Sequence, residues 1–380
     1  MTQNFEVYAV GDFGPRDDWN PPHVISSMKV WPMLQLLKQG PSSVSILAEQ
    51  CGLAIVDAQL ALEKLTRLGV VRRLGGHYIL GFAWFSAVDQ DAVNGAVFPL
   101  AVDLADRICS RRAEIDASVD ALRSRRWSDP RDLRYALVGC FGFDWGGLQA
   151  LNASGHLVHD KAQPGDRRYV LYVQDKVDRF NHKDYAGSHS TSLDDGFTWT
   201  SFGDHSGNRF GLPDLLWHLC GTVSKAGTIP APLRPSAANL VLEGLHLHLR
   251  AAAEGLVGLA HGEPPKGIGL TVLEAVSAIR EGQPAVPIFF QKEDGRAMGV
   301  IVDITKDSLR SVIEESYSSL ERALADLGAL RNGVAFGECF NAIWHTLSGH
   351  TNRVLAEQGF LADPEPCHPG EGRYHLWLTA

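Results

Sequence analysis

"LEKLTRLGVVRRLGGHYIL", residues 62–80, decides how the first part of the chain folds. Its opening residues continue a helical apolar pattern that stops at Gly69, and glycine often ends a helix in the left-handed conformation. Two short runs rich in β-branched and aromatic residues follow, at residues 70–74 and 78–80, with Gly75-Gly76 between them. Such glycines tolerate the positive φ values of tight hairpins. The stretch predicts a helix that leads directly into a β-hairpin.

Two further helices are predicted upstream of this stretch. Apolar residues recur at helical spacing over residues 23–38 and again over residues 44–50, where Ile46 and Leu47 are expected to face inward. Gly40-Pro41 separates the two patterns, and Ser42-Ser43 offers hydroxyl groups for an N-cap. The third helix should run over residues 55–68, with Val56 among its apolar positions. We expect these helices to share one small core that includes Trp31, Leu34, Leu47, Leu60 and Leu65.

Three helices followed by a hairpin is the element order of a winged helix-turn-helix, and residues from about 30 to 80 resemble the DNA-binding domains of MarR- and ArsR-like bacterial regulators. In that family the third helix enters the major groove and the hairpin tip meets the backbone. The resemblance implies six DNA-binding residues on these two elements, namely Gln59, Lys64, Arg67, Arg72, Arg73 and His77. A module for dimerisation or packing is the alternative, because residues 54–58 offer few base readers and Asp57 and Glu63 would repel phosphates.

The composition is that of a globular protein with more than one domain. The 380 residues are 45% hydrophobic and 21% charged, and the net charge of −9 argues against a surface covered with nucleic-acid-binding charge. The six cysteines form no C-x-x-C pair, and the first residues do not resemble a signal peptide. No apolar run is long enough to span a bilayer. We therefore expect a cytoplasmic protein that does not insert into membranes.

The predicted fold class is α+β, with five consecutive segments. They are an N-terminal arm at residues 1–22, the winged helix-turn-helix at 23–82, linker or dimerisation helices at 83–134, a mixed α/β ligand-binding region at 135–234, and an α/β region at 235–380. A long helical pattern over residues 98–126 mixes arginines with nearly as many acidic residues, which is typical of a solvated helix face. "RRYVLYVQDKV", residues 167–177, predicts a strand.

Residues 180–220 combine aromatic, hydroxyl and histidine side chains, as small-molecule pockets do. We expect His189, Trp199, His205 and Trp217 to contact a ligand, with Phe202 in the same pocket. A core whose histidines bond within the protein is equally compatible with this stretch. Candidate metal ligands are His182, His189, His205 and His218, but their spacing matches no known metal site. No G-x-S-x-G frames Ser188 or Ser206 as a nucleophile, so catalytic residues, metal and cofactor stay unassigned.

The last third should begin with a helix at residues 240–256, pass the strand-like runs "AVPIFF" (285–290) and "AMGVIVDI" (297–304), and return to helix over 307–330. Residues 352–378 then parallel the opening stretch. A helix would end at Gly359, a strand would start at Phe360, glycines would reverse the chain, and a strand would return through Tyr374. This pattern predicts a second winged-helix-like unit. Its candidate base-reading residues are His350, Thr351, Asn352 and Arg353.

These features favour a homodimeric transcriptional regulator that binds DNA and responds to a small ligand or a redox state. The alternative is an enzyme that uses the winged helix for dimerisation and has its active site within residues 180–220. A nucleic-acid-processing or peptide-binding module is a third possibility.

Overall fold

The computed structural model describes residues 5–12, 24–25, 30–126, 128–159, 161–163, 167–176, 186–192, 196–204, 247, 250–259, 261–267, 269–270, 273, 279–280, 283–284, 289–364 and 374–379. The fold is mixed α/β. It divides into two units that each combine distant segments of the chain. The first contains Met1–Leu100, Leu148–Phe180 and Val312–Thr346, and the second contains Ala101–Gly147, Asn181–Ser311 and Leu347–Ala380.

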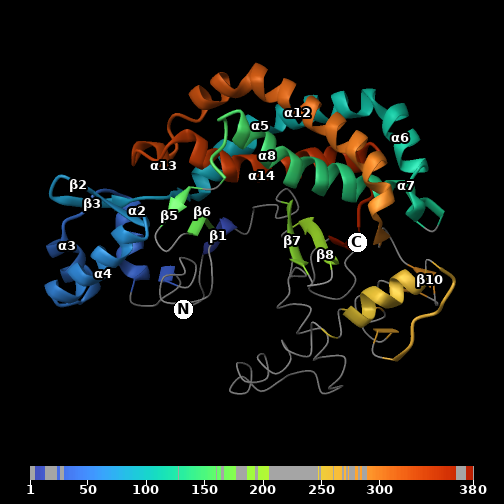
Figure 1. The fold of residues 1–380 in the computed structure, drawn as a ribbon. Coiled ribbons are helices and arrows are strands. Elements are labelled where there is room, and N and C mark those ends of the chain that lie inside the picture. Colours follow the sequence, from blue (N-terminus) through green and yellow to red (C-terminus); the bar gives the residue numbers. More distant parts are fainter. Residues whose placement is uncertain are drawn as a thin grey trace. The chain divides into compact units, whose positions relative to one another are not determined.

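The predicted helices and hairpin of the first unit are present (Figure 1). The helices are α2 (Trp31–Gln39), α3 (Val44–Cys51) and α4 (Ile55–Arg67), and the hairpin is formed by β2 (Val71–Leu74) and β3 (His77–Leu80). The Ser43 hydroxyl caps α3 by accepting a hydrogen bond from the backbone N–H of Ile46. Gly69, just after α4, has a positive φ of +68°. The backbone N–H of Val70 then donates a hydrogen bond of 2.9 Å to the carbonyl of Leu65. Ser42 bridges to Tyr78 in β3, so the segment before α3 lies against the hairpin.

The core of these elements confirms most of the predicted inward positions. Leu34, Leu47 and Leu65 are fully buried in it, and Trp31 packs against it. The prediction for Leu60 was wrong, because this side chain is 60% exposed on α4, and Ile46 and Val56 are exposed as well. The apolar positions of α4 extend around more of the helix than its neighbours cover, and the structure buries the side that carries Ala58, Leu62 and Leu65.

The sheet of the first unit contains a strand that the sequence analysis missed. β1 (Phe5–Asp12) pairs antiparallel with β6 (Arg167–Asp175), although residues 1–22 were expected to be an irregular arm. β4 (Ala83–Phe85) runs parallel to β6, and β5 (Ala162–Gln163) pairs antiparallel with it. Asp175 joins the sheet to α2 by accepting hydrogen bonds from Lys38 Nζ and from Trp84 Nε1 at 2.8 Å. The strand at residues 167–177 is confirmed.

The predicted helix over residues 98–126 is not continuous. α5 (Ala87–Ser110) begins eleven residues before the predicted start at residue 98. Ser86 and Asp89 cap this helix reciprocally: the Ser86 N–H donates a hydrogen bond to Asp89 Oδ2, and the Asp89 N–H donates one to Ser86 Oγ. α6 (Arg112–Asp120) and the 3₁₀ helix η1 (Arg123–Arg126) follow as separate elements. α7 (Pro130–Arg134) then leads into a π-helix, η2 (Tyr135–Gly147), and into α8 (Leu148–Ala153).

The second unit contains a four-stranded sheet in the order β11-β12-β8-β7. Its strands are β7 (Ala186–Ser192), β8 (Thr198–Asp204), β11 (Phe289–Phe290) and β12 (Tyr374–Thr379). Two strands of two residues each, β9 (Ile279–Arg280) and β10 (Gln283–Pro284), pair antiparallel with one another outside this sheet. β12 pairs with β8 and β11, so the returning strand of the proposed C-terminal hairpin does not pair with residues 360–361. Among the described residues, therefore, the predicted pairing of the second winged-helix-like hairpin is not formed.

The last three helices are the long α12 (Gly295–Ala323), the short α13 (Gly328–Arg331) and the long α14 (Phe336–Glu357). The strand predicted from "AMGVIVDI" was wrong, because these residues belong to α12. A 3₁₀ turn, η5 (Lys292–Asp294), starts this helix with a capping box between Gln291 and Asp294. Ile301 and Ile304 are buried three residues apart, which is a helical spacing.

Candidate functional site

All six predicted DNA-binding residues lie on α4 and the hairpin with side chains that are exposed or half-buried. Arg67, Arg73 and His77 are exposed, whereas Gln59 and Lys64 are half-buried. Gln59 Nε2 donates a hydrogen bond to Glu63 Oε1 at 3.2 Å, and the Arg73 guanidinium lies 5.8 Å from the centre of the Tyr78 ring. The basic side chains therefore gather at the last turn of α4 and on the hairpin.

Arg72, the sixth residue, is engaged within the fold. Its Nη2 donates a hydrogen bond of 2.6 Å to the main-chain carbonyl of Asn332, which follows α13. Its Nε is buried and has no hydrogen-bond partner in the described part of the chain, and a Cβ at Gly81 would lie 3.2 Å from its Cγ. The side chain thus links the hairpin to α13, and Arg73 is the arginine of β2 that faces solvent.

The first two turns of α4 present aliphatic side chains to solvent. Ile55 is 58% exposed, Val56 69% and Leu60 60%, and Ile46 on the neighbouring α3 is also exposed. We refer to these four side chains as the α3–α4 face. Scattered exposed aliphatic residues are ordinary, but a group on adjacent turns is typical of an interaction surface.

A second candidate region lies in the second unit, where the sheet packs on η2. Trp145 Nε1 of η2 donates a hydrogen bond of 2.8 Å to Ser188 Oγ of β7. Phe141 of η2 meets Trp377 of β12 with ring centres 5.9 Å apart, and Tyr135 lies 5.3 Å from Phe202 of β8. Long π-helices are uncommon and often occur at functional sites.

Several buried polar atoms in this region have no hydrogen-bond partner among the described residues. They are both side-chain polar atoms of Asn352, the Nε1 of Trp377 and the Oγ1 of Thr379. Asn352 is 7% exposed, and a Cβ at Gly139 of η2 would lie 3.2 Å from its Oδ1 and 2.8 Å from the Phe202 ring. Since buried polar groups are nearly always paired, these atoms indicate a place for ordered water or for a bound polar molecule.

The predicted ligand-binding residues lie elsewhere or outside the described residues. Trp199 is buried in β8, and because alternate residues of a strand face opposite sides, it lies on the other side of the sheet from Phe202. His189 in β7 pairs with Ser201. His182, His205, Trp217 and His218 lie outside the described residues. His350, Thr351 and Asn352 are buried in α14 and are not available to base edges, contrary to expectation.

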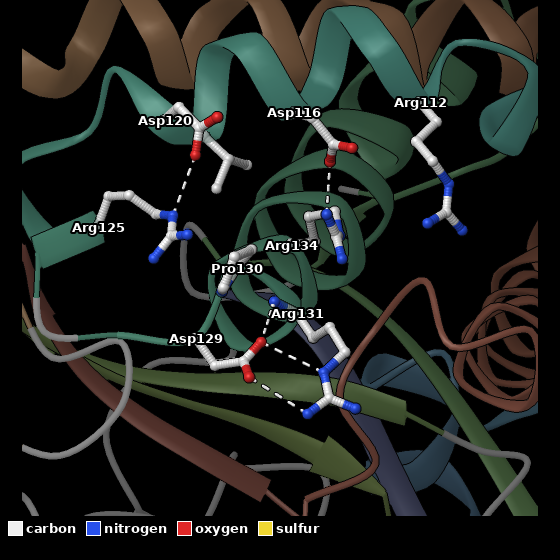
Figure 2. Close-up of a pocket in the computed structure, with 9 residues that line it drawn as sticks. Arg112, Asp116, Asp120, Arg125, Asp129, Pro130, Arg131 and Arg134 are labelled. Carbon is white, nitrogen blue, oxygen red and sulfur yellow. Dashed lines mark hydrogen bonds and ion pairs between the residues drawn. The ribbon is translucent and has the colours of Figure 1, made fainter.

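A pocket of about 340 Å³ is lined by residues 112–134 of α6, η1 and α7. Figure 2 shows ion pairs within it: Arg134 with Asp116 at 2.5 Å, Arg125 with Asp120 at 3.0 Å, and Arg131 with Asp129 at 3.2 Å. The hydrogen bond from Arg131 lowers the pKa of Asp129. The sequence predicts balanced charges on residues 98–126, but the pocket itself depends on α7, and no sequence pattern indicates that α7 packs against α6.

Burial changes the acidity of two side chains on α14. It lowers the pKa of His350 to about 4, and Arg353 adds to the effect, so this imidazole is neutral at pH 7. Burial raises the pKa of the Cys339 thiol to about 12. Within the part of the chain that the structure describes, no group of three or more His, Cys, Asp or Glu side chains is placed to hold a metal ion.

Among the described helices, none is by itself both long and apolar enough to cross a membrane. The comparisons with known proteins leave the family of the chain open. No protein-family model, curated protein sequence or solved structure matches it.

Proposed function

We propose that the protein is a cytoplasmic, ligand-responsive transcriptional regulator in which α2, α3, α4, β2 and β3 form a DNA-binding winged helix-turn-helix. The observation that carries this proposal is the element order, together with the Ser42–Tyr78 bridge that holds the chain against the hairpin. In winged helices the third helix and the hairpin contact the DNA. The exposed basic residues Arg67 and Arg73 lie on those two elements.

The number of phosphate contacts should be small. Lys64, Arg67 and Arg73 are the lysine and arginine members of the proposed contact set that point away from the core, and Arg72 is engaged with Asn332. Each neutralised phosphate adds about −0.9 to the slope of log K against log salt. Three contacts predict a slope of about −3, which corresponds to modest affinity for DNA of any sequence.

The ligand site is proposed in the second unit, between η2 and the face of the sheet that carries Phe202 and Trp377. Asn352 can donate and accept hydrogen bonds, and Trp377 Nε1 can donate one. None of these three atoms has a hydrogen-bond partner among the residues that the structure describes. Because these groups are uncharged and aromatic rings surround them, the site suits a small neutral ligand with amide or hydroxyl groups.

DNA binding is tested by fluorescence anisotropy with labelled duplex DNA. At about 50 mM salt, the double variant Arg67→Ala/Arg73→Ala should bind roughly tenfold or more weakly than the wild type. Arg322→Ala is the matched control, because Arg322 is an exposed arginine in the last turn of α12. Absence of saturable binding by the wild type, or equal loss in the control, would overturn the proposal.

Ligand binding is tested separately by native mass spectrometry of the purified chain. A co-purified small molecule should appear as added mass on the wild type and be absent from Asn352→Leu, which keeps the side-chain size and removes both polar atoms. A matched Asn94→Leu variant, on α5 of the first unit, should retain the molecule. An identical added mass on all three proteins would place the ligand elsewhere, and no added mass on any of them would argue against a tightly held ligand.

A further inference from the structure

The pocket lined by residues 112–134 has one more basic than acidic side chain. Among the described residues, three aspartates line it together with four arginines, namely Arg112, Arg125, Arg131 and Arg134. Three of these arginines pair with the three aspartates (Figure 2). Arg112 has no carboxylate within ion-pair distance in the part of the chain that the structure describes. The pocket therefore has one formal positive charge in excess, on a chain whose net charge is −9.

The spacing of residues along α6 explains why Arg112 is left without an acid. Arg112, Asp116 and Asp120 lie four residues apart, so they share one side of the helix. A base that precedes an acid by four residues is the weaker order for a helical ion pair, and Arg134 of α7 already donates a hydrogen bond to Asp116. The Arg134 side chain is only 7% exposed, so without Asp116 its charge would be buried and uncompensated. Asp116 therefore stays with Arg134.

Phe360 positions two of the guanidinium groups. Those of Arg112 and Arg134 lie 4.9 Å and 4.8 Å from the centre of its ring, which is fully buried. Arg112 is exposed, and its hydrogen bond to Cys109 leaves most of its five N–H donors available. Because the ring already limits the freedom of this side chain, Arg112 loses less entropy when it binds an anion.

Asp116 and Asp120 supply hydrogen-bond acceptors on the same side of α6. In both residues the contact is to Oδ1, which accepts from Arg134 Nη1 in Asp116 and from Arg125 Nε in Asp120. Neither Oδ2 has a hydrogen-bond partner among the described residues. The two side chains are 39% and 67% exposed, so an amino or hydroxyl group can reach these oxygens from solvent. The pocket thus combines an uncompensated cation with two available acceptors.

We propose that this pocket binds a small carboxylic acid that also carries amino or hydroxyl groups. Its carboxylate accepts hydrogen bonds from the Arg112 fork, and its donor groups bond to Asp116 and Asp120. A volume of about 340 Å³ is at the lower end for ligand pockets and suits an amino acid or a hydroxy acid. One excess positive charge balances one carboxylate, whereas the three aspartates repel a phosphate dianion. This site is additional to the one proposed around Asn352 and does not rest on DNA binding.

Saturation-transfer difference NMR of the full chain tests this pocket. The probes are the standard amino acids, lactate, glycerate and inorganic phosphate. At least one acid should bind saturably and more tightly than phosphate. Arg112→Gln should weaken its binding about tenfold or more, because the charge that pairs with the carboxylate is lost. Arg112→Lys should have intermediate affinity, since it keeps the charge and loses the planar fork. Arg322→Gln, at an exposed position in α12, is the matched control and should bind like the wild type.

Saturable binding of none of these probes, or equal affinities for the wild type and Arg112→Gln, would overturn the proposal. Phosphate that binds more tightly than every acid would contradict the charge argument in the same way.

Asp120→Asn tests whether the aspartates set the selectivity. This variant removes one negative charge and replaces an available acceptor oxygen by an amide N–H₂ group. The ratio of the affinity for the acid to that for phosphate should therefore fall about tenfold. Circular dichroism checks that each variant is folded. A ratio that stays at the wild-type value would contradict the placement of the ligand between Arg112 and the aspartates.

Discussion

Replacing Arg72 by alanine should destabilise the hairpin and leave DNA contacts intact, although Arg72 and Arg73 are neighbours in the sequence. Arg72 donates a 2.6 Å hydrogen bond to the carbonyl of Asn332, whereas Arg73 is exposed and has the Tyr78 ring as its neighbour. A hydrogen bond from a charged donor contributes about 1.5–3 kcal/mol. Because Arg72 is only half-buried, we expect the lower end of this range, about 1.5 kcal/mol. Arg73→Ala should stay within about 0.5 kcal/mol of the wild type.

Amide hydrogen exchange in β2 and β3 measures the local opening free energy of the hairpin in both variants. Arg72→Ala should lower this free energy and leave the salt dependence of DNA binding unchanged. Arg73→Ala should show the reverse pattern, with normal protection and a salt slope that is less steep by about 0.9. If Arg72→Ala kept full protection and reduced the slope, the hydrogen bond to Asn332 would not be the role of this residue.

Three further predictions concern burial. Leu65→Ala should lower the free energy of unfolding by about 2–5 kcal/mol in urea titrations, whereas exposed Leu60→Ala should change it by less than about 0.5 kcal/mol. The Cys339 thiol, whose pKa is raised to about 12, should resist alkylation at pH 8 in the folded protein and react after unfolding, while half-buried Cys51 should react faster than Cys339 in the folded protein. Protonation of His350 opposes folding, so stability should fall from about pH 6.5 to 4, and His350→Gln should flatten this decline.

Local sequence signals predicted the helix–hairpin elements well, because their ends depend on single residues. Ser43 caps α3, and Gly69 takes the positive φ that ends α4. The exposed side of α4 was harder to predict. Its apolar residues cover more than one side of the helix, and only the packing against α3 and β2 decides that Leu65 is buried and Leu60 is not.

Long-range pairing explains the remaining differences. Phe5–Asp12 forms a strand only because β6, more than 150 residues later, supplies its hydrogen bonds. Tyr374 leads a strand as expected, but its partner is β8 and not the preceding segment. Asn352 was predicted to be a base-reading residue. Its burial beside Gly139 depends on the contact of α14 with η2, which no spacing in the sequence indicates.

The central claim, that the helix–hairpin elements contact DNA through three cations, is tested most directly by the salt dependence of wild-type binding. The affinity for a duplex of random sequence should be measured by anisotropy between about 50 and 200 mM salt. We predict a slope of log K against log salt of about −3, reduced to about −1 in Arg67→Ala/Arg73→Ala. No measurable binding at the lowest salt, or a slope that the double variant does not change, would contradict the claim.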